Sequence, residues 1–177
     1  AALDGTASAG AATGLVHLSE LTIKPCQPCP PRGWGQCRDG KDCVIEDDDF
    51  QSLRARLIGA EALVFATPVY FGDLSEPAKI FLDRLRRMEW PRREETPLKG
   101  KPVIGIAAAG GSGMGPVTAI ASLERYMTYL QLQHVVYLPV SRQNQELQLR
   151  AAYEAGVFLA RRYLVKEPAG AQPGAPA

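Results

Sequence analysis

The chain has 177 residues, which suits one α/β domain with a sizeable core and leaves little room for a second. Hydrophobic residues make up 46% and charged residues 22%, with a formal net charge of +1, as in an ordinary globular protein. No long basic run or basic-aromatic stripe occurs, and no apolar stretch approaches the roughly 18–20 residues that cross a bilayer. We therefore expect neither a nucleic-acid nor a membrane partner.

The first residues, Ala1–Gly14, are rich in small side chains and lack the charged and strongly apolar regions of a signal peptide. A cytoplasmic location follows as the expectation. The next residues, Leu15–Leu18, are expected to form an edge strand. The chain does not begin with Met, and we expect the natural gene to extend upstream of Ala1.

Three short, almost wholly apolar runs predict strands that are buried on both faces of a parallel sheet. They are Ala62–Ala66, Val103–Ala107 and Val135–Val140. Helical patterns fill the gaps, the first of them after the acidic run Asp47–Asp49, whose carboxylates favour a helix N-terminus. Strands that alternate with helices predict a doubly wound α/β sheet.

We assign residues 1–165 to one domain, with the cysteine loop 24–44 inserted in it. The polar, proline-bearing stretch Trp90–Lys99 is interpreted as a connector. Residues 166–177 have too little apolar content to fold, and we expect a disordered tail there.

The residues directly after the first apolar run form a candidate ligand-binding turn. Thr67, Pro68, Val69, Tyr70, Phe71 and Gly72 end in a glycine and contain a proline, so we expect a rigid turn. Such a turn offers backbone hydrogen bonds and aromatic rings to a flat ligand, which is what the edge and face of an isoalloxazine ring require. The two aromatic residues could equally be core or dimer contacts.

A second loop, Ala108–Gly115, follows the next apolar run and contains four glycines that let a backbone approach a ligand closely. It matches neither a phosphate loop, because no Lys follows, nor a dinucleotide-binding fingerprint. A loop without function is the alternative. In a doubly wound sheet both loops lie where ligands bind, at the carboxyl ends of the strands.

The cysteines carry the sharpest signal. Cys26, Cys29, Cys37 and Cys43 are separated by two, seven and five residues. Four thiolates in one short loop can hold a metal ion or cluster, and the candidates are an iron–sulfur cluster, a structural zinc or free thiols. If the thiols are free, Cys26 and Cys29 could act as a redox switch that forms a disulfide on oxidation.

Other polar residues carry weaker signals. Arg84, Arg86 and Arg87 are interpreted as a solvated helix face, with a phosphate or dinucleotide contact as the functional alternative. His17 and His134 are interpreted as ordinary polar residues. The sequence lacks the Gly-x-Ser-x-Gly and His-Glu-x-x-His motifs of common hydrolases.

The strings IKPCQPC, GWGQCRDGKDCVIEDDDFQ and ALVFATPVYFGDLSEPAKIFLDRL resemble the NADPH-dependent FMN reductase-like flavodoxin superfamily, and within it the iron–sulfur flavoprotein branch. The resemblance runs from about Leu15 to about Leu164. It implies a flavodoxin-like five-stranded parallel sheet, FMN as cofactor, NAD(P)H or a small redox protein as electron donor, and homodimers or homotetramers that complete the flavin pocket.

The resemblance also implies roles for particular residues. Thr67–Gly72 match the turn that contacts the isoalloxazine, and Ala109, Gly110 and Gly111 match a second flavin-contacting loop. The four cysteines match, in order, the loop that holds a [4Fe–4S] cluster.

Two departures from the family pattern stand out. Seven residues separate the second and third cysteines, where the branch usually has two. The first strand of the sheet and the loop that binds the FMN phosphate do not precede Leu15, and Ala1–Gly14 looks like the tail of the helix that follows them. The predicted function is an FMN-dependent oxidoreductase or electron-transfer flavoprotein, and the alternative is a flavodoxin-like scaffold with a zinc-stapled cysteine loop and no flavin.

Overall fold

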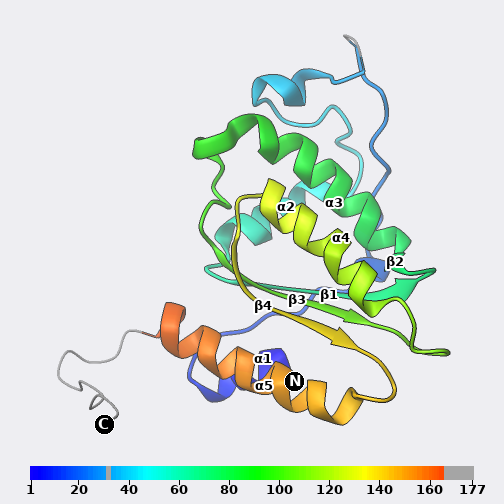
Figure 1. The fold of residues 1–177 in the computed structure, drawn as a ribbon. Coiled ribbons are helices and arrows are strands. Elements are labelled where there is room, and N and C mark those ends of the chain that lie inside the picture. Colours follow the sequence, from blue (N-terminus) through cyan, green and yellow to red (C-terminus); the bar gives the residue numbers. More distant parts are fainter. Residues whose placement is uncertain (31–32, 166–177) are drawn as a thin grey trace.

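A computed structural model describes residues 1–30 and 33–165 (Figure 1). Its sheet has the strand order β2-β1-β3-β4. The strands β1 (Leu63–Tyr70), β3 (Pro102–Ala108) and β4 (Gln133–Val140) run parallel, and the two-residue β2 (Asp73–Leu74) pairs antiparallel with the end of β1. The three predicted strands and the flavodoxin-like α/β class are confirmed.

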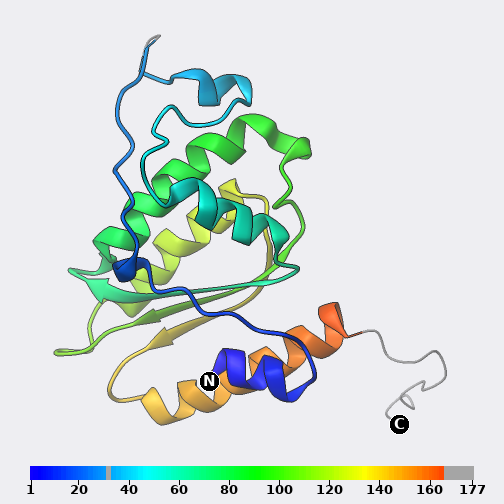
Figure 2. The same ribbon diagram turned by 180° about the vertical axis from the view of Figure 1, so that it is seen from behind.

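Helices cover both faces of the sheet (Figures 1 and 2). On one side lie α2 (Phe50–Gly59), α3 (Glu76–Glu89) and α4 (Pro116–Tyr129), and on the other α1 (Ala2–Ser8) and α5 (Gln145–Leu159). Three short 3-10 helices, η1 (Leu18–Glu20), η2 (Gln36–Asp39) and η3 (Trp90–Glu95), and a π-helical turn, η4 (Ala160–Leu164), complete the described chain. None of the helices in the described ranges is long and apolar enough to cross a membrane.

The main core lies between the sheet and α2, α3 and α4. It includes Phe50, Phe81, Leu85, Val103 and Leu123, which are all buried. A smaller cluster of Ala2, Leu138 and Ala152 lies on the other face, against α1 and α5. The central strand β3 is buried along most of its length, as its continuous apolar run predicts.

Two predicted segments differ from the structure. The edge strand expected at Leu15–Leu18 is wrong, because the chain there runs without a strand partner into η1. Its apolar side chains, Val16 and Leu18, pack against the main core instead. The connector expected at Trp90–Lys99 begins with the helix η3. After α1 the chain passes from the α1 and α5 layer to the opposite layer (Figure 2).

The resemblance implies five strands for the family, and the described residues of this chain contain four, one of them antiparallel and only two residues long. β1 pairs with β3 from Leu63 to Pro68, while on its other side β2 pairs only with Val69 and Tyr70. The helix expected near the start of the chain is present as α1. The predicted disordered tail, 166–177, lies outside the described residues.

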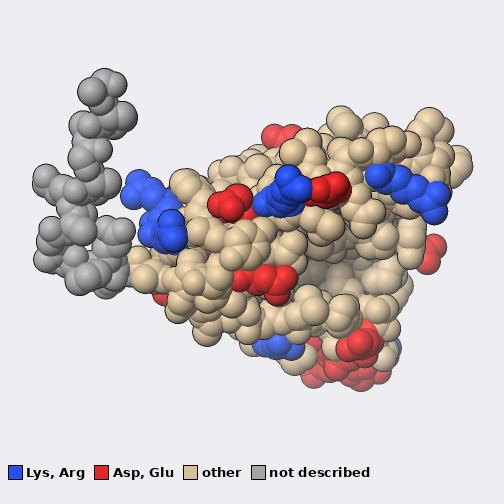
Figure 3. All heavy atoms as spheres, turned by 90° about the horizontal axis from the view of Figure 1, so that it is seen from below, with Lys and Arg blue, Asp and Glu red and all other residues tan. Residues whose placement is uncertain are grey.

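The helices α1 and α5 pack through glycines. A Cβ atom on Gly156 would lie 2.0 Å from the backbone oxygen of Ala2, and one on Gly5 would lie 2.0 Å from that of Tyr153. The Thr6 hydroxyl lies within hydrogen-bond distance of the Ala2 and Gly156 carbonyl oxygens, at 3.0 and 3.2 Å. Seen from the side of α1 and α5, charged side chains of both signs are scattered over a mostly uncharged surface (Figure 3).

This close packing makes Gly156→Ala destabilising, although alanine normally favours a helix over glycine. The added methyl group would have to push α1 away from α5, and overpacking of this kind costs about 1–3 kcal/mol in the free energy of unfolding. Urea unfolding followed by circular dichroism measures the change. The matched control is Gly59→Ala in α2, where a Cβ meets nothing within 4 Å. Equal stability of the two variants would contradict the packing argument.

Candidate functional site

The parallel strands β1 and β3 end at the same edge of the sheet, and the two predicted flavin-contacting loops begin there (Figure 1). The predicted turn Thr67–Gly72 is shorter than expected, because β1 continues to Tyr70. Phe71 and Gly72 alone form the turn of a hairpin to β2, with φ angles of +52° and +81°. Positive φ at both positions is the geometry of a tight two-residue hairpin.

Strand alternation separates the predicted residues into two groups. The Thr67 side chain is buried and turns toward α3, where its oxygen accepts the Ser75 N–H at 3.1 Å and lies 3.2 Å from the Ser75 hydroxyl. Val69 packs against the main core. Pro68 and Tyr70 alternate with these two residues and are exposed. The Thr67 and Val69 side chains therefore hold the strand in place, and Pro68 and Tyr70 are free to meet a ligand.

The glycine loop lies beside the end of β4. The Ala109 N–H donates to the Val140 carbonyl at 2.8 Å, and the Gly113 N–H closes a turn on the Gly110 carbonyl at 2.8 Å. Gly110 and Gly111 are exposed, and a Cβ on either would meet nothing within 4 Å. The loop thus presents exposed backbone at the carboxyl edge.

The hairpin and the start of α4 are joined directly. The Thr118 hydroxyl lies 2.6 Å from the Gly72 carbonyl oxygen and 2.9 Å from that of Gly115. A Cβ on Gly115 would lie 2.7 Å from the Gly72 Cα, so only glycine permits this approach. The glycine loop, which leads into α4, and the hairpin therefore form one continuous surface.

That surface is unusually apolar for an exposed one. Phe71 is fully exposed, at 109% of its reference area, and Met114 is 77% exposed. Tyr70 and Val117 are also exposed large hydrophobic residues. Exposed apolar groups gathered on one surface mark a place where a ligand or a partner binds.

Two shallow hollows of the described surface lie along α4. The larger, of about 380 Å³, is bordered by Trp90 of η3, and the smaller, of about 250 Å³, lies between α4 and α3. They share Arg125 and Tyr129, and the smaller one includes Arg86. At its wall the Tyr126 hydroxyl donates to Asp83 at 2.6 Å, and Lys79 donates to Asp83 at 2.8 Å. Neither hollow includes a predicted flavin-contacting residue, although the smaller one reaches Asp73, the residue after Gly72.

The cysteine loop lies on the far side of α3 from the sheet, in the outermost part of the fold (Figure 1). All four cysteines are free thiols and none is fully buried. The Cys37 sulfur lies 2.9 Å from the Trp34 carbonyl oxygen, and the Cys29 sulfur lies 3.4 Å from that of Gln27. The loop is thus separate from the carboxyl edge of the same chain.

The four sulfurs are near one another without forming a closed site. No group of three or more His, Cys, Asp or Glu side chains within the described ranges is arranged to hold a metal ion. Burial is the main cause that raises the pKa of the Cys26 thiol, Arg87 opposes it, and the other three cysteines add to it through their charge. Burial likewise raises the pKa of Cys37.

Gly35 packs closely against Cys29. Gly35 adopts a φ of +66°, and a Cβ there would lie 2.8 Å from the Cys29 Cβ and 3.6 Å from its sulfur. A side chain at this position would collide with Cys29 and displace its thiol. Four soft sulfur donors in one loop are of the kind that bind iron–sulfur clusters or zinc, so the residues present fit such a group in their chemistry.

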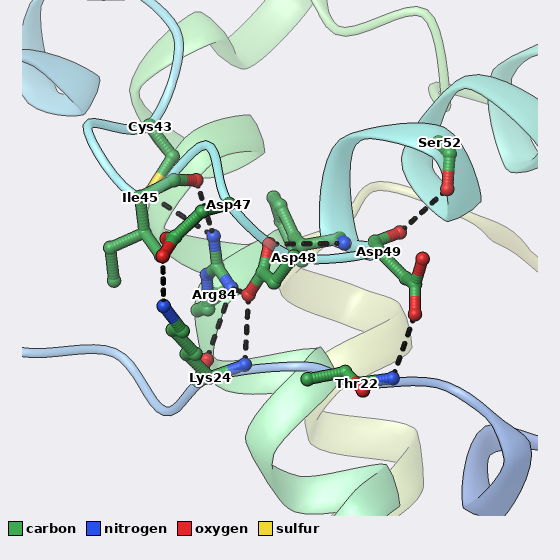
Figure 4. Close-up of polar contacts among 10 residues, drawn as sticks. Thr22, Lys24, Cys43, Ile45, Asp47, Asp48, Asp49, Ser52 and Arg84 are labelled. Atoms are coloured by element: carbon green, nitrogen blue, oxygen red, sulfur yellow. Dashed lines mark hydrogen bonds and ion pairs between the residues drawn. The ribbon is translucent and has the colours of Figure 1, made fainter.

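Arginines fasten the loop through its backbone carbonyls. Arg84 donates to the Lys24 carbonyl at 3.0 Å and to the Ile45 carbonyl at 3.1 Å, which places one side chain at both ends of the loop (Figure 4). Arg87 donates to the Gly33 carbonyl and lies 4.5 Å from the Trp34 ring centroid. Arg92, in η3, donates to the Gly40 carbonyl at 2.6 Å.

These contacts correct the interpretation of Arg84 as part of a solvated or phosphate-binding face. Arg84 is 1% exposed and pairs with Asp48, whose side chain is fully buried. The sequence contained a signal for this burial, because Arg84 lies three residues after Phe81 and four before Met88, on the apolar stripe of α3. The role of Asp48 had no comparable signal.

Asp48 is held as a carboxylate by its surroundings (Figure 4). Burial alone would raise its pKa, but hydrogen bonds from the Lys24 N–H, the Arg84 guanidinium and the Phe50 N–H, with the charge of Arg84, lower the pKa below its ordinary value. The neighbouring Asp49 accepts the Thr22 N–H at 2.7 Å. The acidic run therefore starts α2, as predicted, and also ties the entry of the cysteine loop to its exit.

Comparisons with known proteins agree with this arrangement. The sequence profile described as "NADPH-dependent FMN reductase" matches residues 1–145. An iron–sulfur flavoprotein of Methanosarcina thermophila is 31% identical over 127 residues, which cover 72% of this chain and 62% of that protein. One from Archaeoglobus fulgidus is 34% identical over 119 residues, covering 67% of this chain and 54% of that protein.

Among solved structures, RosB with the bound intermediate 8-demethyl-8-formylriboflavin-5′-phosphate superposes with a TM-score of 0.64 at 14% identity, over 91% of this chain and 71% of that chain. This likeness is one of fold. The chain spans little more than half the length of the two curated relatives.

The buried ion pair predicts that Asp48→Asn is strongly destabilising at neutral pH, by about 3–5 kcal/mol, because it leaves the Arg84 charge uncompensated. The pKa of Asp48 is lower in the folded chain than in the unfolded chain. Its contribution to the free energy of unfolding is therefore complete above the unfolded-chain pKa and is lost as the pH falls below about 4. The difference in unfolding free energy between the wild type and Asp48→Asn should therefore shrink with acidification.

Urea unfolding at a series of pH values measures that difference. Asp47→Asn is the matched control, because Asp47 pairs with Lys24 on the surface and its side chain is 77% exposed. It should have little effect at any pH. A difference for Asp48→Asn that stayed constant from pH 7 to pH 3 would contradict the prediction.

Proposed function

Because the chain belongs to the NADPH-dependent FMN reductase family, we propose that it is an FMN-dependent oxidoreductase whose flavin lies at the carboxyl edge of the sheet. The observation that carries the proposal is the continuous surface made by the hairpin and the glycine loop, joined by Thr118 and Gly72. The proposed contacts are those of the sequence prediction: Thr67, Pro68, Val69, Tyr70, Phe71, Gly72, Ala109, Gly110 and Gly111.

The geometry divides the work among these residues. Thr67 and Val69 would contact the flavin through their backbone, because the Thr67 side chain bonds to Ser75 and the Val69 side chain packs against the core. Pro68, Tyr70 and Phe71 offer exposed faces on which a flat ring can lie. Gly110 and Gly111 leave backbone groups open for the edge of the ring. FMN itself supplies the redox chemistry, either as hydride transfer or as single electrons, so no side chain need act as acid or base.

The cysteine loop is proposed to hold a [4Fe–4S] cluster through Cys26, Cys29, Cys37 and Cys43. Its support is the set of four free thiols in one loop, the arginines that fix the loop, and the relatives named iron–sulfur flavoproteins. Such a cluster accepts and donates one electron at a time when bound. A zinc ion is the alternative occupant, since both take thiolate sulfur.

Electron donors and subunit partners complete the proposal. The family description favours a nicotinamide donor, NADPH or NADH, with a small redox protein as the alternative. The carboxyl edge exposes Phe71, Met114 and Val117. This supports a homodimer or homotetramer in which a second copy covers the flavin. A cytoplasmic location remains the expectation, and nucleic acid is not among the expected partners.

Anaerobic purification followed by a visible spectrum and counts of flavin, iron, sulfide and zinc tests these assignments together. Bound or rebound FMN with about four irons and four sulfides per chain supports the full proposal. Protein that contains zinc, lacks iron and sulfide and does not bind added FMN would instead identify the zinc-stapled scaffold.

The flavin edge makes a separate prediction for Phe71→Ala. The ring is fully exposed in the folded chain, so its loss should leave the unfolding free energy nearly unchanged. Loss of a stacking face should weaken FMN binding by about tenfold, of the order of an aromatic contact. Quenching of FMN fluorescence during titration measures the dissociation constant.

Phe158→Ala is the matched control, because Phe158 lies on α5 and is 52% exposed away from the carboxyl edge. Its FMN affinity should equal that of the wild type. An unchanged affinity in Phe71→Ala would exclude the ring from the flavin site.

A further inference from the structure

Arg84 contacts a cysteine sulfur in addition to the backbone carbonyls that hold the loop. One terminal nitrogen donates to the Lys24 carbonyl and to Asp48, and the other donates to the Ile45 carbonyl and to the sulfur of Cys43 at 3.4 Å (Figure 4). Its guanidinium also lies 4.1 Å from the centroid of the Phe50 ring. The whole side chain is 1% exposed.

The contact with Cys43 differs from those of the other cysteines. Within the described residues, the hydrogen bonds of Cys26, Cys29 and Cys37 all go to backbone carbonyls. Those bonds need the thiol proton and disappear when the sulfur becomes a thiolate. The bond at Cys43 has the sulfur as acceptor, so it persists and strengthens when that sulfur carries negative charge.

We propose that Arg84 is a positioning residue for the thiolate site, which holds the Cys43 sulfur in place and stabilises it as a metal ligand. This inference rests on the proposed metal-binding function of the four cysteines. Groups that hydrogen-bond to metal ligands orient them and tune the metal, and their loss commonly weakens metal binding 10–100-fold.

The surroundings of Arg84 explain why an arginine is needed. Asp48 neutralises its charge, which makes burial tolerable. The planar guanidinium can reach Lys24, Ile45 and Cys43 at the same time, because its donors point in fixed, diverging directions. A lysine would keep the charge but has a single nitrogen, and it could not serve both ends of the loop and the sulfur together.

Cobalt(II) is the probe for a test, because its thiolate complexes give a sulfur-to-metal charge-transfer band in the near ultraviolet. The reduced, metal-free full chain is titrated with Co²⁺ against a competing chelator. Arg84→Lys should bind Co²⁺ about 10–100-fold more weakly than the wild type, with an altered charge-transfer band. Arg86→Lys, on the same helix but beside the hollow over α3 and α4, should bind as the wild type does.

The outcomes distinguish a failure of the proposed thiolate site from a failure of the proposed role of Arg84. A wild-type chain that binds no Co²⁺ contradicts the proposed thiolate site itself. A wild type that binds, together with a folded Arg84→Lys variant of equal affinity and identical spectrum, contradicts only the role of Arg84.

A second measurement uses the wild type alone and decides the matter if Arg84→Lys does not fold. In protein loaded with ¹¹³Cd²⁺, a hydrogen bond from Arg84 to a cadmium-bound sulfur should shift the Arg84 Nη proton resonance and couple it to the cadmium nucleus. A purely structural arginine would show neither effect, and their absence would overturn the proposal.

Discussion

The buried pair of Arg84 and Asp48 is the interaction on which the placement of the cysteine loop depends. Ordering a chain costs about 1–2 kcal/mol per residue in backbone entropy, and the only regular structure in the described part of the loop is the short helix η2. Cys37 and Cys43 pack against the main core. Arginines of α3 and η3 also hold the loop and its exit through four carbonyls, those of Lys24, Gly33, Gly40 and Ile45. Arg84 donates to the carbonyls of both Lys24 and Ile45, so one guanidinium holds the two ends of the loop together.

A different constraint shapes the carboxyl edge of the sheet. Parallel strands bring the ends of β1 and β3 together, and the two-residue period of a strand then decides which side chains face outward. Thr67 turns inward and fixes the start of α3 through Ser75, while Pro68 and Tyr70 remain free. The same short stretch therefore builds the scaffold and offers the proposed binding surface.

Much of this could be predicted from the sequence, because buried parallel strands appear as unbroken apolar runs. The run Val103–Ala107 became β3 for that reason. The extent of β1 could not be predicted in the same way, since Thr67 and Pro68 are typical of a turn. The chain tolerates Pro68 in a strand because β1 has a full-length neighbour on one side only.

Tertiary contacts account for what the sequence did not predict. Leu15–Leu18 does not form a strand because no other strand lies beside it, and a pattern of four residues cannot indicate whether such a partner exists. The burial of Arg84 was encoded in the apolar stripe of α3, but its partners come from residues 24 and 43–48, which only the folded chain brings together.

The helix α3 links the two candidate sites. Its first residue follows Ser75, which is bonded to Thr67 at the carboxyl edge, and its later turns hold the cysteine loop through Arg84 and Arg87. Arg84 lies about 12 Å along the helix from Glu76, at 1.5 Å per residue. Because the core side chains Phe81 and Leu85 lock the same helix against the sheet, the loop cannot shift relative to the carboxyl edge without disturbing the core. The two sites are therefore held at a fixed separation within one chain. If both cofactors bind as proposed, their spacing is a property of α3 and of how copies of the chain assemble, and the cysteine loop itself has little freedom to change it.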